Sequence, residues 1–303
     1  MARSLWALCV MTCAALTAMD ARSQHSAAPQ GRTHTVFVTA TEENGAPVVD
    51  LAAADFAVKE DGKDREVLRA ELARVPMQLA IIVDDNGTGI FRAGLVSFVR
   101  LLQGRAEIAL SSVVGQTHRL VDYTPNAEKV LEAVMGLSAR PGTNDGGQLL
   151  EGIFQASKDQ EKRGATRPVI VALTVGGEEH STVPAHNVLD QLAKTGSTLY
   201  VIQVAGTLLR PTVQITQPRQ LLGENLNLSE VLGEGPKQTG GWREEIVAST
   251  GLVPGLGRIA AELKSQYVLE YSRPPKGKPL ERLNVSVKRR GLDLRAPTKV
   301  AGR

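Results

Sequence analysis

IIVDDNGTGI (residues 81–90) decides the fold, because it joins an apolar run to a loop of two Asp, an Asn, two Gly and a Thr. The run is typical of a buried strand, and the helical pattern GIFRAGLVSFVRLLQGR follows the loop. Doubly wound α/β proteins place ligands at such loops, at the carboxyl ends of their strands. The loop is therefore a candidate site for catalysis or metal binding, and the alternative is that it is only a turn.

The surrounding sequence alternates between strand and helix patterns. QLAIIVDD, AEIALSSVV, RPVIVALTV and STLYVIQVAG are apolar strand patterns, and amphipathic helices of about 10–15 residues separate them. This alternation predicts a doubly wound, mostly parallel sheet with helices on both faces. Residues 208–240 contain several Pro and Gly residues and little periodicity, so we expect a long loop there. Residues 243–266 return to a helical pattern.

Both ends of the chain after its first 31 residues have strand patterns. THTVFVTA alternates with Val36 and Val38 on one face, and DFAVKEDGKDREV predicts a hairpin that turns at Asp61 and Gly62. QYVLEYS and LERLNVSVKRR predict a second strand pair, and GLDLR adds a further strand. We therefore expect an N-terminal β segment (32–75), an α/β domain (76–265) and a C-terminal β segment (266–303).

The amino terminus predicts export. Residues 1–23 contain a basic Arg3, an apolar run shorter than the roughly 20 residues that span a bilayer, and small residues Ala21 and Ser23 at a cleavage-site spacing. We interpret them as a signal peptide, followed by a linker (24–31), with no membrane span after cleavage. Both cysteines, Cys9 and Cys13, lie in this run, so disulfides are not expected in the mature protein. The prediction is a secreted or periplasmic protein.

The charge balance gives no indication of a nucleic-acid partner. The 303 residues have a formal net charge of +3, and the basic cluster KRR (288–290) is short and typical of a solvated strand end.

Two long blocks resemble one family, the VWFA-related Acidobacterial domain family of von Willebrand factor A (VWA) proteins. VFVTATEENGAPVVDLAAADFAVKEDGKDREV resembles its opening block, and LKSQYVLEYSRPPKGKPLERLNVSVKRRGLDLR resembles its closing block. The resemblance implies a VWA fold for the α/β domain and a small β-sandwich built from the two terminal β segments. It also implies a metal-ion-dependent adhesion site, at which three loops supply oxygen ligands to Mg²⁺.

The resemblance carries this metal site over only in part. Asp84 matches the first acid, Asn86 replaces a Ser, and Thr88 replaces a second Ser with its hydroxyl retained. Thr143 in PGTNDGG matches the Thr of the second loop. Val175 stands where the third loop should supply an Asp, and a valine side chain cannot bind a cation. We therefore interpret the site as degenerate and expect no cofactor, with Mg²⁺ as the ion that an intact site would take.

The predicted function is binding of a protein or cell-surface ligand through the top of the sheet, without catalysis. One alternative is metal-dependent adhesion with a substituted ligand, for which Glu178 and Glu179 are the nearest acids. A different class is a phosphotransfer enzyme similar to the haloacid dehalogenases, with Asp84 as nucleophile and Thr174 as a phosphate-binding residue. That chemistry needs an acid two residues after the nucleophile, where this sequence has Asn86.

Overall fold

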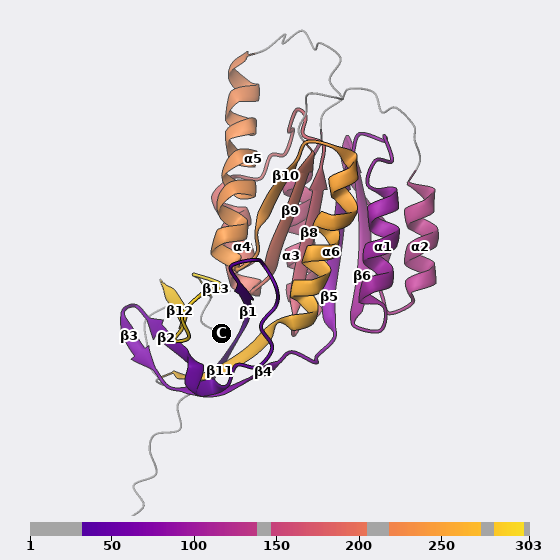
Figure 1. Cartoon of the computed structure of the whole chain (residues 1–303). Helices are drawn as coiled ribbons and strands as arrows, with labels where there is room; N and C mark the ends of the chain where they lie inside the picture. The colour runs from indigo at the N-terminus through magenta and orange to yellow at the C-terminus, as the bar shows by residue number, and fades with distance from the viewer. Residues whose placement is uncertain (1–31, 138–146, 205–217, 274–281, 300–303) are drawn as a thin grey trace, which may run out of the picture. The chain divides into compact units, whose positions relative to one another are not determined.

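A six-stranded sheet lies at the centre of the fold, within the residues 32–137, 147–204, 218–273 and 282–299 that the computed structural model describes (Figure 1). Its strand order is β10-β9-β8-β5-β6-β7. The strands are β5 (Met77–Asp84), β6 (Ala106–Val114), β7 (Gln116–Thr124), β8 (Pro168–Thr174), β9 (Thr198–Val204) and β10 (Arg243–Ile246). Neighbouring strands are parallel except for β6 and β7. The doubly wound, mostly parallel sheet expected from the sequence is confirmed.

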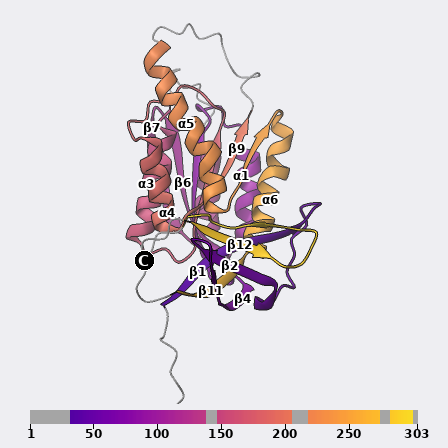
Figure 2. The same ribbon diagram turned by 90° about the vertical axis from the view of Figure 1, so that its left-hand side faces the viewer.

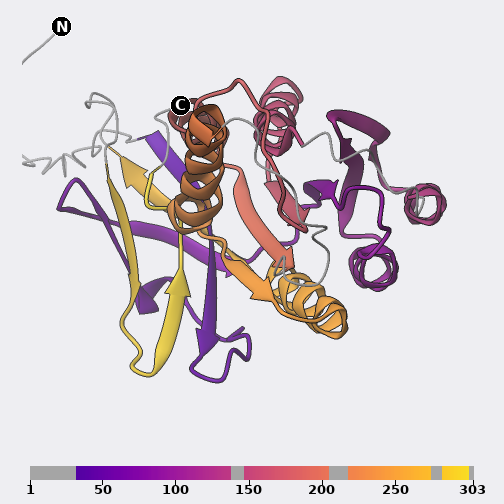
Figure 3. The same ribbon diagram turned by 90° about the horizontal axis from the view of Figure 1, so that it is seen from above.

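Helices pack on both faces of this sheet, and Figure 3 shows the three layers from above. One face carries α1 (Arg92–Leu102), α2 (Ala127–Gly136) and α6 (Leu252–Ser265), and the other carries α3 (Leu149–Lys162), α4 (Ala185–Thr195) and α5 (Pro218–Thr239). The central strand β5 divides its side chains between the two cores. Leu79 and Ile81 pack in the core with α1, whereas Ala80 and Ile82 pack in the core with α3. A strand covered on both faces has no polar alternation, which explains its continuous apolar run.

The central sheet contains two strands that the sequence pattern does not indicate. β7 forms an antiparallel hairpin with β6 after Gly115, whose φ is 66°. The expected helix over residues 243–266 is wrong for its first part, because β10 pairs in parallel with β9 and α6 begins only at Leu252. The ladder with β9 and the burial of Ile246 outweigh the helix propensity of the charged residues around it.

The expected loop over residues 208–240 is wrong where the structure describes it, because α5 occupies Pro218–Thr239. Val231 is fully buried against the sheet. Gly235 faces β9 so closely that a Cβ there would lie 2.9 Å from Leu199 Cδ2. The Gly and Pro residues that suggested a loop therefore include one that permits close helix packing.

Two antiparallel sheets combine strands from both ends of the described chain (Figure 2). One has the order β13-β1-β11-β4 and the other the order β12-β2-β3. The strands are β1 (Arg32–Glu42), β2 (Phe56–Glu60), β3 (Lys63–Arg65), β4 (Val67–Leu72), β11 (Tyr267–Arg273), β12 (Leu283–Val287) and β13 (Leu292–Arg295), and the 3-10 turns are η1 (Ala53–Asp55) and η2 (Ser249–Gly251). The predicted hairpin turn at Asp61 and Gly62 has φ values of 48° and 79°.

The two antiparallel sheets share one apolar core, which confirms the β-sandwich built from both chain ends. Val36 and Val38 are 3% and 0% exposed, as the alternation in β1 predicts. Tyr267 of β11 stands at the centre of this core. Its ring packs edge-on against Phe56 with centroids 5.5 Å apart, and its hydroxyl accepts a hydrogen bond of 3.0 Å from the Leu51 amide. The predicted signal peptide and linker lie outside the described residues.

A buried arginine joins the β-sandwich to the α/β part. Arg167, which precedes β8, is 3% exposed. Its guanidinium donates to the Val75 carbonyl at 3.4 Å, to the Leu263 carbonyl, and to Gln266 Oε1 at 2.8 and 3.3 Å, and it lies 5.5 Å from the Phe37 ring centroid. Among the described residues no carboxylate forms an ion pair with it. Burial lowers its pKa to about 10, so the group stays charged at neutral pH.

We expect Arg167→Met to lower the free energy of unfolding by about 2–4 kcal/mol, because the Leu263 carbonyl and Gln266 Oε1 lose their donor while they stay buried. Urea denaturation followed by circular dichroism measures the change. Arg74→Met is the matched control, because Arg74 is an exposed arginine between β4 and β5. Its free energy of unfolding should stay within about 0.5 kcal/mol of that of the wild-type protein. Equal effects of the two variants would show that Arg167 does not hold the junction.

Candidate functional site

The carboxyl ends of β5 and β8 bring the first and third predicted loops together. Asp84 and Thr174 are paired in register at the ends of these strands. The Thr174 hydroxyl donates to Asp84 Oδ2 at 2.6 Å, and the Val175 amide donates to the Asp84 carbonyl at 2.9 Å. Gly147, which precedes α3, is also close, because a Cβ on it would lie 3.1 Å from Asp84 Oδ1. Val175 therefore lies directly beside Asp84, the one acid that matches the metal site implied by the resemblance.

The loop after Asp84 is a tight turn organised by Asp85. Both oxygens of this buried carboxylate accept from backbone amides, Oδ1 from Gly87 at 3.0 Å and Oδ2 from Gly89 at 2.7 Å. Asn86 has a φ of 50°, a left-handed conformation that Asn tolerates better than most residues. The side chains of Asn86 and Thr88 are exposed. Asp85 thus shapes the turn, a role that the sequence does not distinguish from ligand binding.

Asp84 is held in surroundings that favour its neutral form. The pKa of this carboxyl is raised to about 7, mainly by burial and also by the nearby Glu179 and Asp85 carboxylates. The hydrogen bond from Thr174 acts in the opposite direction. Part of the Asp84 population is therefore protonated at neutral pH.

Glu179, one of the two acids that follow Val175, caps helix α3. It is 2% exposed, and its oxygens accept from the amides of Leu149 and Leu150, each at 3.2 Å, and from the Ser181 hydroxyl. An acid at a helix N-terminus is stabilised by the free amides and by the helix dipole. No local sequence signal indicates this role, because about 30 residues separate the acid from the helix start that it caps.

The described residues at this edge do not by themselves form a site for the divalent cation that the resemblance implies. Val175 is 9% exposed, packs in the core and offers no side-chain oxygen. The oxygens of Asp85 and Glu179 are bonded to amides, and Thr143 lies outside the described residues. Within the described ranges, no three His, Cys, Asp or Glu side chains are grouped so as to hold a metal ion. An octahedral oxygen shell would need ligands that these residues do not supply.

Two other sequence features have structural roles. GLGRIA (255–260) formally matches the GxGxxA dinucleotide fingerprint, but it lies inside α6 instead of following a strand. A Cβ on Gly255 would lie 3.2 Å from Ile246 Cδ1, so this glycine permits a helix-packing contact. In the basic cluster, Lys288 Nζ donates to the Ala54 carbonyl at 2.8 Å and Arg289 pairs with Asp50 at 2.9 Å. These two charges of the cluster are thus used within the β-sandwich.

The chain is similar to known proteins in structure, but its sequence matches none of them. No family model matches the chain, and no characterised protein matches it. Its structure is similar to a von Willebrand factor type A structure from Catenulispora acidiphila, with 11% identity, a TM-score of 0.46, and coverage of 91% of this chain and 75% of that chain. The vWF domain of the type V pili tip protein Mfa5 from Porphyromonas gingivalis has 12% identity, a TM-score of 0.44, and coverage of 62% and 95%.

A third similar structure is proximal thread matrix protein 1 from the mussel byssus, with 10% identity and a TM-score of 0.45. The match covers 63% of this chain and 49% of that one, so the chain spans about half the length of the mussel protein. One structure of that mussel protein has a zinc-occupied MIDAS motif. The architecture of the present chain is a mostly parallel sheet between helices, with separate antiparallel sheets. What the chain binds has to be argued from its own residues.

Asp84→Asn should stabilise the protein increasingly as the pH rises. Because the pKa of Asp84 is about 7 in the folded state and 3.8 ordinarily, its contribution to stability is full below pH 3.8 and is lost as the pH rises through 7. Asn keeps an acceptor for Thr174 and has no charge to bury. We expect a gain of about 2–4 kcal/mol at pH 8 and little at pH 4, measured by urea denaturation. Exposed Asp190→Asn should show no such trend, and a gain independent of pH would contradict the assignment.

Proposed function

We propose that the chain is a secreted, non-catalytic VWA-type interaction protein of the VWFA-related Acidobacterial family, which binds a protein or cell-surface ligand without a metal ion. The observation that carries the proposal is that the acids near Val175 are buried and bonded within the fold. Asp84 favours its neutral form, Asp85 binds loop amides and Glu179 caps a helix. The scaffold of an adhesion site is kept, while the side chains that would attract a cation are used within the fold.

The same acids argue against phosphotransfer. A nucleophilic Asp84 would have to be ionised, yet burial and the neighbouring acids raise its pKa. The residue two positions on is Asn86, whose exposed side-chain amide cannot act as a general acid or base. Thr174 donates to Asp84 itself at 2.6 Å instead of facing an empty phosphate position. These contacts support a binding function over catalysis.

The surface at the carboxyl ends of the strands supports a protein partner. Val247 follows β10 and is 73% exposed, and Val253 in the first turn of α6 is 44% exposed. Asn86 and Thr88 are exposed at the same edge, because β5 and β10 are parallel strands of one sheet. Apolar side chains mixed with neutral polar ones are typical of a protein interface.

Export is supported by the predicted signal peptide. Among the described residues, no helix is long and apolar enough to cross a membrane.

Calorimetric titration with Mg²⁺ or Mn²⁺ tests the loss of the metal site. The wild-type protein should show no binding at millimolar metal. Val175→Asp combined with Asn86→Ser should restore binding with a Kd of about 10⁻⁴–10⁻³ M, because it supplies a second acid and a compact hydroxyl. Asp84→Ala in that repaired background should abolish the gain. Tight metal binding by the wild-type protein would contradict the proposal, and so would a folded repaired variant that ignores metal.

Capture from a native cell-envelope extract tests the binding surface. Protein immobilised on beads should retain the same partner in chelator and in Mg²⁺. Val247→Glu should reduce retention by about tenfold, because it places a charge in an apolar contact. Leu68→Glu is the matched control, since Leu68 is 48% exposed on β4 of the β-sandwich. Retention that requires Mg²⁺ would contradict metal independence, and equal effects of the two variants would exclude the upper edge of the sheet as the interface.

A further inference from the structure

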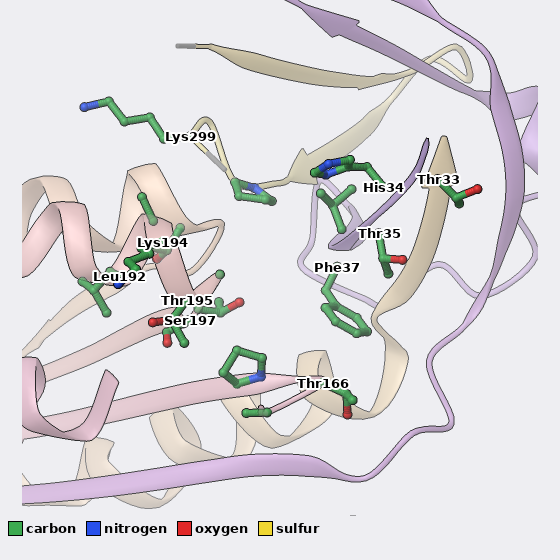
Figure 4. A pocket seen from close by; sticks show the side chains of 18 of the residues that line it. Thr33, His34, Thr35, Phe37, Thr166, Leu192, Lys194, Thr195, Ser197 and Lys299 are labelled. Atoms are coloured by element: carbon green, nitrogen blue, oxygen red, sulfur yellow. The ribbon is translucent and has the colours of Figure 1, made fainter. Parts of the chain in front are cut away.

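Two cavities of similar size differ in what they offer to a partner. One, of about 510 Å³, lies between β1 and the end of α4 (Figure 4), but Thr195 and Ser197 on its α4 side are buried and bonded within the fold. The other, also of about 510 Å³, is a groove between α5 and β10. Gly233, Pro236 and Lys237 line its α5 side, and Trp242, Arg243 and Glu245 line its β10 side. This groove gives access to the last strand of the central sheet.

Strand β10 has a free edge. It ends the strand order of the central sheet, so one of its sides has no neighbouring strand among the described residues (Figure 1). On its other side, the Val201 amide of β9 donates to the Trp242 carbonyl at 3.0 Å, and Arg243 is in register with Val201. Because the backbone groups of successive strand residues point to opposite sides, those of Arg243 and Glu245 point away from β9. These groups have no hydrogen-bond partner within the described chain and can pair with an added strand.

The side chains of this edge have opposite charges on one face. Arg243 and Glu245 are both exposed and both line the groove beside α5. The Arg243 guanidinium donates to a neutral partner, Gln203 Oε1, at 2.7 Å. Neither Arg243 nor Glu245 forms an ion pair with a described residue. Both charges are therefore available to an incoming strand.

The opposite edge strand of the sheet, β7, is less suited to pairing. Its ladder with β6 shifts register between Ile108 and Leu110 and again between Leu110 and Ser111. Its Arg119 pairs with Asp159 of α3 at 2.6 Å. Irregular pairing is one of the features that keep an edge strand from adding another strand. The short β10 keeps a regular register with β9, so β10 is the edge that remains suitable.

The sequence of β10 complements its own reverse. In an antiparallel pair of two β10 strands centred on Glu244, Arg243 of each copy lies opposite Glu245 of the other. Residues directly opposite each other have their side chains on the same face, so both charge pairs are attractive. The outward backbone groups of these residues also face each other, and such a pair exchanges both of its hydrogen bonds. Backbone and charge therefore favour the same register.

The centre of this register is its unfavourable point, because Glu244 would lie opposite Glu244 of the other copy. Within each copy the Arg258 guanidinium donates to Glu244 Oε1, so each carboxylate has its own counter-charge. The side chain also lies against α6, where a Cβ on Gly255 would be 3.2 Å from Glu244 Oε2. The repulsion is therefore smaller than that between two unpaired glutamates.

We propose that the chain forms a two-fold dimer, in which the β10 strands of two copies pair antiparallel and join the two central sheets into one. A second copy fits this edge better than an unrelated peptide, because the edge requires an acid and a base on alternate residues in a fixed order, and the chain itself supplies them. The dimer goes beyond the proposed ligand binding and does not depend on it. Its interface uses neither Asp84 nor the loop that follows.

Sedimentation equilibrium of the purified chain in chelator tests self-association. We expect a monomer–dimer equilibrium with a Kd of about 10⁻⁵–10⁻⁴ M, because the paired edge is short. At ten times the Kd, hydrogen exchange of the Arg243 and Glu245 amides should slow by about fivefold, since most copies are then paired. The Leu120 amide of β7 is the control and should not change. A chain that stays monomeric at about 10⁻³ M would overturn the proposal and leave the edge to another partner. A dimer without protection of Arg243 and Glu245 would also overturn it.

Charge reversal tests the register. Arg243→Glu and Glu245→Arg each place like charges opposite each other in their own homodimers, so each should raise the Kd by about tenfold or more. An equal mixture of these two variants should form a heterodimer with a Kd near that of the wild-type dimer, because every charge pair is again opposite. Lys129→Glu on exposed α2 is the matched control and should leave the Kd unchanged.

Urea midpoints verify that each of these variants is folded. Single variants that dimerise as well as the wild-type protein would show that the copies do not pair through β10. A mixture that associates no better than the separate variants would exclude the antiparallel register centred on Glu244.

Discussion

The buried Arg167 guanidinium holds the two points at which the chain crosses between the β-sandwich and the α/β part. Val75 lies just before β5, and Gln266 lies just after α6, so one side chain contacts both crossings. Only a planar group with five donors can serve several acceptors in this way. The Leu263 carbonyl in the last turn of α6 adds the favourable end of a helix dipole. These oxygens replace the carboxylate that a buried cation ordinarily needs. The Phe37 ring of β1, whose centroid lies 5.5 Å from the guanidinium, belongs to the same cluster.

Much of this architecture can be predicted from hydrophobic periodicity, because each central strand must be covered on both faces. β5 and β8 stand out for that reason, and the pairing of Asp84 with Thr174 follows from their being neighbours. Elements defined by tertiary contacts cannot be predicted in this way. The residues of β10 have no strand pattern, and only the free edge of β9 orders them as a strand. In α5, Gly235 resembles a helix breaker until the position of Leu199 is known.

In the candidate site, too, the sequence predicts which residues are present but not the tertiary contacts of their side chains. The sequence identifies Asp84 and the unusual Val175, because both depend only on position along the chain. It does not show what each acid is bonded to. Asp85 and Glu179 have carboxylates, the side-chain groups that commonly bind divalent cations, yet their oxygens accept hydrogen bonds from backbone amides. Orientation of a carboxylate depends on where free amides lie in the fold, and that information appears only when distant segments meet.

The two edges of the central sheet also differ in electrostatic character. At the carboxyl ends the acids are buried, and burial raises the pKa values of Asp84, Asp85 and Glu179. At the amino ends Arg32 and Lys299 lie at the surface with no acid beside them. The acids at the carboxyl ends are therefore enclosed by the fold, whereas the cations at the amino ends are exposed.

The pairing of β1 with β11 has a consequence for the order in which the protein folds. These strands lie more than 220 residues apart in the sequence, and β11 separates β1 from β4 in the sheet. Pairs so distant close slowly, because the intervening chain must first become compact. The α/β part can use its own local contacts, whereas β1 and β4 have no partner until β11 has been made. During synthesis the N-terminal strands would therefore expose apolar edges for longest, and a holding chaperone would act most usefully on that segment.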